Sequence, residues 1–85
     1  MSYAVEYLPP AEDELISAWT AAPDQALVTA VVHRLEQLLR INPWRVGRPY
    51  QSPLNRVVLA SPVGMWFDIV EDDKKVLVLS VWSIP

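Results

Sequence analysis

The stretch Lys75-Val76-Leu77-Val78-Leu79-Ser80-Val81-Trp82 decides the fold of this chain. Six of its eight residues are apolar, several are β-branched, and neither Gly nor Pro interrupts it. A strand with one exposed face alternates apolar and polar side chains, whereas this one is apolar on both faces. The stretch therefore predicts a central strand that is covered on both sides and on which the other elements dock.

Size and composition bound the class of protein. The 85 residues, 52% hydrophobic and 20% charged, predict a single globular domain spanning residues 1–85. The absence of cysteine excludes disulfides, thiolate metal sites and thiol nucleophiles. No apolar run approaches the ~20 residues that span a bilayer, and the amino terminus does not resemble a signal peptide. We expect a soluble, cytoplasmic protein.

The charge is unevenly distributed along the chain. The net charge of −3 argues against a nucleic-acid partner, and residues 1–24 carry five acids and no basic residue. Residues 33–56 reverse this balance, with five arginines against the single Glu36. This local basic region is either a phosphate-binding surface or ordinary solvated arginine. The arginines are Arg34, Arg40, Arg45, Arg48 and Arg56.

The first half of the chain predicts a strand and two helices. Ser2 to Leu8 alternates as a strand does. Pro9-Pro10 ends that strand and suits the first turn of a helix, which we expect to run to about Ala21. After Asp24, apolar residues recur at i, i+3, i+4 and i+7, which predicts a second helix. Asn42-Pro43 stops this helix, because the residue before a proline is pushed out of the α region.

The second half predicts a loop and an antiparallel meander. Pro43 to Pro53 holds three prolines, two arginines and a glycine, so we expect a loop there. Three strands joined by tight turns are predicted next, at Leu54 to Ala60, Met65 to Val70 and Lys75 to Trp82. The predicted order is β-α-α-β-β-β. This is an α+β domain in which a helical hairpin packs on one face of a meander plus the N-terminal strand.

The chemistry that remains after exclusion is centred on arginine. The sequence has no Gly-rich phosphate loop, no zinc-ligand spacing and no Ser/His/acid set. Arg45, Arg48 and Arg56 suit the holding of phosphate by bidentate geometry and permanent charge. Trp44 and Tyr50 are interleaved with them, and these rings either stack on bases or pin the loop to the core.

Several motifs, taken in order, resemble the RelE/ParE toxins of bacterial type II toxin–antitoxin modules. They cover nearly the whole chain, and their order and spacing together carry the resemblance. The motifs are Tyr3-Ala4-Val5-Glu6-Tyr7, Pro10-Ala11-Glu12-Asp13-Glu14-Leu15, Asn42-Pro43 through Gly47, Asn55-Arg56-Val57-Val58, Met65-Trp66-Phe67-Asp68-Ile69-Val70 with Asp72-Asp73-Lys74, and Val76 through Trp82.

The resemblance implies one of two activities. RelE-like members cut mRNA in the ribosome with basic residues of the later strands and a His, Arg or Tyr at the end of the last strand. ParE-like members poison DNA gyrase without cutting RNA. Arg56 matches one basic position, but Asn55 stands where a second Arg is common and Phe67 where Tyr is common. The last strand ends Trp82-Ser83-Ile84-Pro85, so the acid/base set for RNA cleavage is incomplete.

The resemblance therefore predicts a growth-inhibiting toxin component of a kind that includes plasmid-stabilisation proteins. The expected partners are a cognate antitoxin and either ribosome-bound mRNA or DNA gyrase, with no cofactor and no metal. The expected phosphate-facing cations are Arg45, Arg48 and Arg56, and Arg56 is the candidate catalytic residue. The alternative is a catalytically inactive RelE/ParE-fold protein that acts as a protein-interaction or homodimeric module.

Two tryptophans are candidates for partner binding. If Trp66 and Trp82 lie on the sheet face away from the helices, they form an exposed apolar patch there. Such patches mark protein–protein contact sites. We expect this patch to bind the antitoxin or a second copy of the chain.

Overall fold

The computed structural model describes residues 2–85, and its elements follow the predicted order with one additional strand and one short 3-10 helix. No helix within this range is long and apolar enough to cross a membrane. The elements are β1 (Ala4–Tyr7), α1 (Pro9–Ala21), α2 (Gln25–Ile41), η1 (Pro43–Arg45), β2 (Arg48–Ser52), β3 (Asn55–Ala60), β4 (Val63–Val70) and β5 (Lys75–Ser83).

The two helices begin and end where the sequence predicts. Two prolines open α1, at positions where a backbone N–H would have no helical partner. The Asp24 carboxylate caps α2 by accepting from the Leu27 N–H at 3.0 Å. Asn42 ends α2, and its side-chain oxygen accepts from the Trp44 N–H at 3.2 Å to start η1. Local capping chemistry therefore sets the limits of the helical hairpin.

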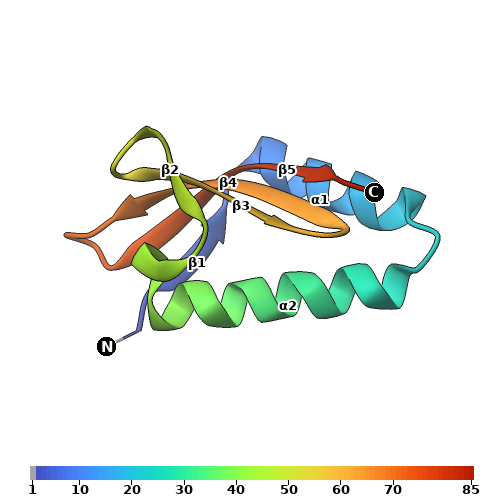
Figure 1. Ribbon diagram of the computed structural model, residues 1–85, viewed down its shortest axis with the longest axis horizontal. Coiled ribbons are helices and arrows are strands. Elements are labelled where there is room, and N and C mark those ends of the chain that lie inside the picture. Colours follow the sequence, from blue (N-terminus) through green and yellow to red (C-terminus); the bar gives the residue numbers. More distant parts are fainter. Residues whose placement is uncertain (1) are drawn as a thin grey trace.

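The five strands form one sheet in the order β1-β5-β4-β3-β2. β1 pairs in parallel with β5, and all other neighbours are antiparallel. Figure 1 shows α2 running along one side of this sheet, while α1 lies beside the end of β5. The α+β prediction is confirmed, and the first strand takes its place at the edge beside β5.

One segment differs from the prediction. Pro43–Pro53, expected as a loop, contains η1 and the strand β2, which pairs Arg48 with Val57 of β3. Every residue of β2 is exposed, and Pro49 lies within it. Pro and polar residues are tolerated in a strand at a sheet edge, where one side needs no ladder hydrogen bonds. An edge strand of this composition therefore looks like a loop in the sequence.

The two faces of the sheet are in different environments. The face towards α2, here called the inner face, is packed against the helices (Figure 1). The opposite face, here called the outer face, consists of half-buried or exposed residues such as Leu77, Leu59 and Trp82, apart from the buried Asn55 and Gly64. The expectation that β5 is covered on both sides is therefore wrong. The buried inner residues include Val63, Met65, Phe67, Ile69, Val76, Val78 and Val81.

A bulge in β5 decides which of its residues face outward. Trp66 of β4 lies opposite Ser80, whereas the next residue, Phe67, lies opposite Val78. Leu79 therefore has no opposite partner, and the alternation of faces changes phase at this point. As a result Val78 and Val81 both point inward, and Trp82 points outward.

The helix α1 closes the part of β5 that β1 does not reach. β1 pairs with β5 only as far as Val78. Beyond it, the Glu14 carboxylate of α1 accepts hydrogen bonds from the Val81 N–H and the Ser80 hydroxyl, both at 3.1 Å. A side chain thus satisfies a strand edge that would otherwise be open.

Candidate functional site

The outer face carries a hollow lined by three aromatic rings. Its volume is about 430 Å³, and we call it the aromatic hollow. β2, β3, β4 and β5 each contribute at least one side chain to it. The lining residues are Tyr50, Gln51, Val57, Trp66, Ser80 and Trp82.

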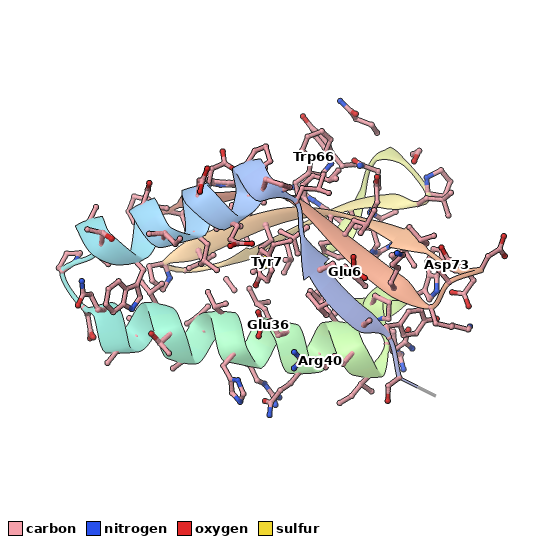
Figure 2. The ribbon with its side chains drawn as sticks, turned by 180° about the vertical axis from the view of Figure 1, so that it is seen from behind. Glu6, Tyr7, Glu36, Arg40, Trp66 and Asp73 are labelled. Carbon is pink, nitrogen blue, oxygen red and sulfur yellow. The ribbon has the colours of Figure 1, made fainter. Side chains whose placement is uncertain are left out.

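Polar contacts hold the Trp66 ring in place at the centre of this hollow. The Trp66 indole N–H donates to the side-chain oxygen of Asn55, whose amide in turn donates to Asp68 at 2.7 Å. The Tyr50 ring meets the indole edge to face, with centroids 6.1 Å apart and an interplanar angle of 85°. Figure 2 shows Trp66 on the side of the sheet opposite α2. The ring is therefore orientated before any partner arrives.

Trp82 lies flat over a glycine of the neighbouring strand. A Cβ atom added to Gly64 would lie 2.4 Å from the Trp82 ring. Only glycine leaves room for this close approach of indole and backbone. Trp66 and Trp82 thus share one hollow on the outer face, as the partner-binding hypothesis requires, and partner binding itself stays a prediction.

Arg56 is placed differently from the expectation. It lies opposite Phe67 on the inner face, and only 8% of its surface is exposed. Its Nε donates to the Val46 carbonyl and its Nη2 to the Gly47 carbonyl, each at 2.9 Å. These bonds tie the segment after η1 to β3. This placement argues against a phosphate-facing, catalytic Arg56 and identifies a structural residue.

The other two arginines are exposed, but on different faces. Arg48 pairs with Val57 and so shares its outer face. Arg45 lines a separate hollow on the helix side, together with Ile41 and Val58. The three arginines therefore do not form one cationic surface, and phosphate contact by Arg45 and Arg48 stays a prediction.

Two polar clusters lie outside the outer face and are structural. The Glu71 carboxylate accepts from Tyr3 Oη and Trp44 Nε1, both at 2.8 Å, and from Lys74 Nζ. The bonds from Lys74, Trp44 and Tyr3 lower the pKa of Glu71 from 4.5 to about 2. Trp44 therefore pins its segment to the β4–β5 turn, one of the two roles considered for it.

The second cluster joins β1 to α2. Tyr7 Oη donates to Glu36 at 2.7 Å, and Glu36 also lies 3.9 Å from Arg40 (Figure 2). Burial, followed by the hydrogen bond to Glu36, raises the pKa of the Tyr7 hydroxyl. Tyr7 is therefore a neutral donor at physiological pH.

Sequence reasoning missed Asn55 as the residue that orientates Trp66, and Tyr50 as a wall of the hollow. A weak signal for Tyr50 existed. Arg48 and Tyr50 are two residues apart, the spacing that places side chains on one face of a strand. The proline between them concealed the strand.

Comparison with known proteins gives one consistent result. No family model and no curated protein sequence matches the chain. Among solved structures, it matches the toxin–antitoxin complex RelBE2 of Mycobacterium tuberculosis with a TM-score of 0.79 at 20% identity, over 98% of this chain and 99% of that one. The chain has the RelE/ParE toxin fold.

Two further structures extend this likeness to both branches of the fold. The ParDE system of P. aeruginosa matches with a TM-score of 0.72 at 18% identity, over 99% of this chain and 98% of that one. The isolated RelE toxin of E. coli matches with a TM-score of 0.73 at 16% identity, over 99% of this chain and 86% of that one. The RelE/ParE fold thus accounts for nearly the whole chain.

On this RelE/ParE fold, the outer face offers binding groups more than proton-transfer groups. Its aromatic hollow holds two indoles and a phenol, and its cations are Arg48 at the β2 edge and Lys75, which lies 3.7 Å from Glu6. Tyr50 and Ser80 supply hydroxyls, and the Ser80 hydroxyl donates to Glu14. The same Glu14 oxygen also accepts from the Val81 N–H, so this carboxylate serves to close the edge of β5. The arrangement suits burial of an apolar protein segment.

Proposed function

We propose that this protein is the toxin component of a type II toxin–antitoxin module, and that its cognate antitoxin covers the aromatic hollow of the outer face. The observation that carries the proposal is the exposure of this face on a complete RelE/ParE fold. Tyr50 remains 64% exposed, and Trp66 and Trp82 are only half-buried. Aromatic side chains in a central pocket supply much of the affinity of protein interfaces.

The composition of the outer face favours a toxin that acts by binding over one that cleaves RNA. Cleavage through the 2′-hydroxyl needs a base, an acid and cations for the developing charge. Arg48 and the Tyr50 hydroxyl are the groups of the hollow and its rim that fit the last two roles. Arg56, the expected catalytic cation, is engaged by two carbonyls. A gyrase poison requires no such set.

The first test is induction of the chain alone in bacteria. The measurements are growth rate, the positions of mRNA 5′ ends and plasmid supercoiling. We expect growth arrest with altered supercoiling and intact mRNA. Arrest accompanied by mRNA cuts at ribosomes would replace the gyrase version with the nuclease version. Normal growth at good soluble expression would overturn the toxin proposal and favour the inactive interaction module.

A matched pair of variants separates binding from cleavage. Tyr50→Phe keeps the ring that packs on Trp66 and removes the hydroxyl. A binding toxin keeps its activity in this variant, whereas a nuclease that uses Tyr50 as acid loses it. Tyr50→Ala removes the ring as well, and we expect it to weaken either kind of toxin by loss of the hollow's wall.

A further inference from the structure

The row of residues that crosses the outer face at Trp66 has opposite charges at its two ends. Reading across the sheet, Arg48 of β2 pairs with Val57, Val57 with Trp66, and Trp66 with Ser80. Ser80 in turn donates to Glu14 of α1. The row therefore begins at an arginine, passes through the aromatic hollow and ends at a carboxylate. Its strand-borne part spans about 14 Å at the usual spacing of strands.

The acidic end of the row is a built surface and not a single side chain. A hollow of about 370 Å³ separates α1 from the end of β5. Asp13, Glu14 and Ser17 line it from α1, and Trp82 lines it from β5. Trp82 also lines the aromatic hollow, so the two hollows lie on either side of this residue. Along this row the surface is thus basic at β2, aromatic in the middle and acidic at α1. The other charged side chains of the outer face are already paired within the chain, since Asp68 accepts from Asn55 and Lys75 lies 3.7 Å from Glu6.

We propose that this surface is self-complementary and that two copies of the chain associate through it as a symmetric dimer. A two-fold axis that lies in the interface along the strands reverses the row in the second copy. Arg48 of each copy then faces Asp13 and Glu14 of the other, and the indoles meet at the centre. An axis across the strands would oppose arginine to arginine, so the charge pattern selects the first arrangement.

The size of the outer face is sufficient for such a dimer. The strands have 4, 5, 6, 8 and 9 residues, and at about 3.3 Å along and 4.8 Å across a strand they give a face of roughly 500 Å² per copy. Two copies would bury roughly 1,000 Å², the size at which weak, reversible interfaces begin. The half-buried Trp66 lies on the central strand β4, while Arg48 and the acids of α1 lie at the rim, an arrangement found in known interfaces. We expect association in the micromolar range.

The inference does not require toxin activity, because it concerns the purified chain alone. It bears on the proposed function in one way. A second copy would occupy the aromatic hollow, so antitoxin or target would bind in competition with self-association. Failure to arrest growth would leave the dimer untouched, and a monomeric chain would leave the toxin proposal untouched.

The test is sedimentation velocity of the purified protein over a concentration series that spans the micromolar range. We expect the mass to rise from 9.6 kDa to twice that value. Arg48→Glu and Asp13→Arg should each remain monomeric, because each opposes like charges at both ends of the interface. An equimolar mixture of the two variants should recover the dimer, because each supplies the charge that the other lacks.

The control is Trp19→Ala, which removes an exposed tryptophan of the helical hairpin outside both hollows. It should dimerise as the unmodified chain does. A wild-type chain that stays monomeric throughout the series would overturn the proposal. So would dimers of both single variants with undiminished affinity, or a mixture that stays monomeric while the wild type dimerises.

Discussion

Trp66 and Phe67 are neighbours in β4, yet they lie in opposite environments. Phe67 points inward and is fully buried, whereas Trp66 points outward, is half-exposed and is held by a hydrogen bond to Asn55. The inner face is filled by aliphatic and aromatic side chains, together with Arg56, which is bound to two backbone carbonyls. The outer face holds the orientated aromatic rings and the charged ends. Under the proposed function, one sheet separates stability from recognition, and variants on each side should separate the two properties as well.

The largest expected effect is on the inner face. Phe67→Ala should lower the free energy of unfolding by about 3–5 kcal/mol, because it leaves a cavity in the core. Trp66→Ala should cost about 1–2 kcal/mol, because the ring is half-exposed and one hydrogen bond is lost. Urea denaturation of both variants measures the difference. Equal losses of unfolding free energy in the two variants would contradict the distinction between the two faces.

The next effect concerns Arg56. Arg56→Met should lower the free energy of unfolding by about 2–4 kcal/mol, because the Val46 and Gly47 carbonyls lose a charged donor. Its effect on the salt dependence of RNA binding should be nil. Arg48→Ala is the matched control, since Arg48 is exposed and should leave stability nearly unchanged. A stable Arg56→Met with a weakened salt slope would restore Arg56 as a phosphate ligand.

A smaller effect is expected from Gly64→Ala on the outer face. The added methyl group would clash with the Trp82 ring, which must then swing away from the sheet. Because the ring can move outward, the cost in stability should be only about 1 kcal/mol. Tryptophan emission should shift to longer wavelength, and binding by the outer face should weaken. An unshifted spectrum would contradict the placement of Trp82.

The smallest effect is on stability at acidic pH. It arises from the Glu71 carboxylate and its hydrogen-bond donors, which lie outside both faces. The folded pKa of Glu71 is about 2, against an ordinary value of 4.5. Folding is therefore stabilised by this carboxylate above about pH 4.5, and that contribution is lost as the pH falls towards 2. Glu71→Gln should flatten the loss of stability in this window. An unchanged slope would mean that other carboxylates cause the loss.

The sequence predicts those parts of the fold that depend on local chemistry. Pro9-Pro10, Asp24 and Asn42-Pro43 mark both helices because caps and prolines act within a few residues. The pairing of β1 with β5 joins segments some seventy residues apart, and no local pattern encodes it. The additional strand β2 was missed because its edge position permits proline and full exposure.

The sites were harder to predict, because a side chain's face depends on register. Without the bulge at Leu79, the alternation begun by Val76 would send Trp82 to the inner face. From the sequence, Arg56 is predicted to be a surface cation. Only the pairing of β3 with β4, which places it opposite Phe67, shows that it faces inward. The sequence suggested that Trp66 and Trp82 could lie on one face of the sheet. The bulge that places them there is a property of the pairing between β4 and β5, which local sequence does not encode.

The measurement that tests the division between the faces most directly compares Trp82 of the outer face, which is half-buried, with Trp19 of the helical hairpin, which is 42% exposed. Trp82→Ala empties part of the aromatic hollow, whereas Trp19→Ala removes an indole from the helical hairpin. Loss of a central aromatic side chain typically costs an interface about 2 kcal/mol or more. At matched soluble expression, we predict that induction of Trp19→Ala arrests bacterial growth and that induction of Trp82→Ala does not. Arrest by Trp82→Ala together with loss of arrest by Trp19→Ala would place recognition on the helices and contradict this account.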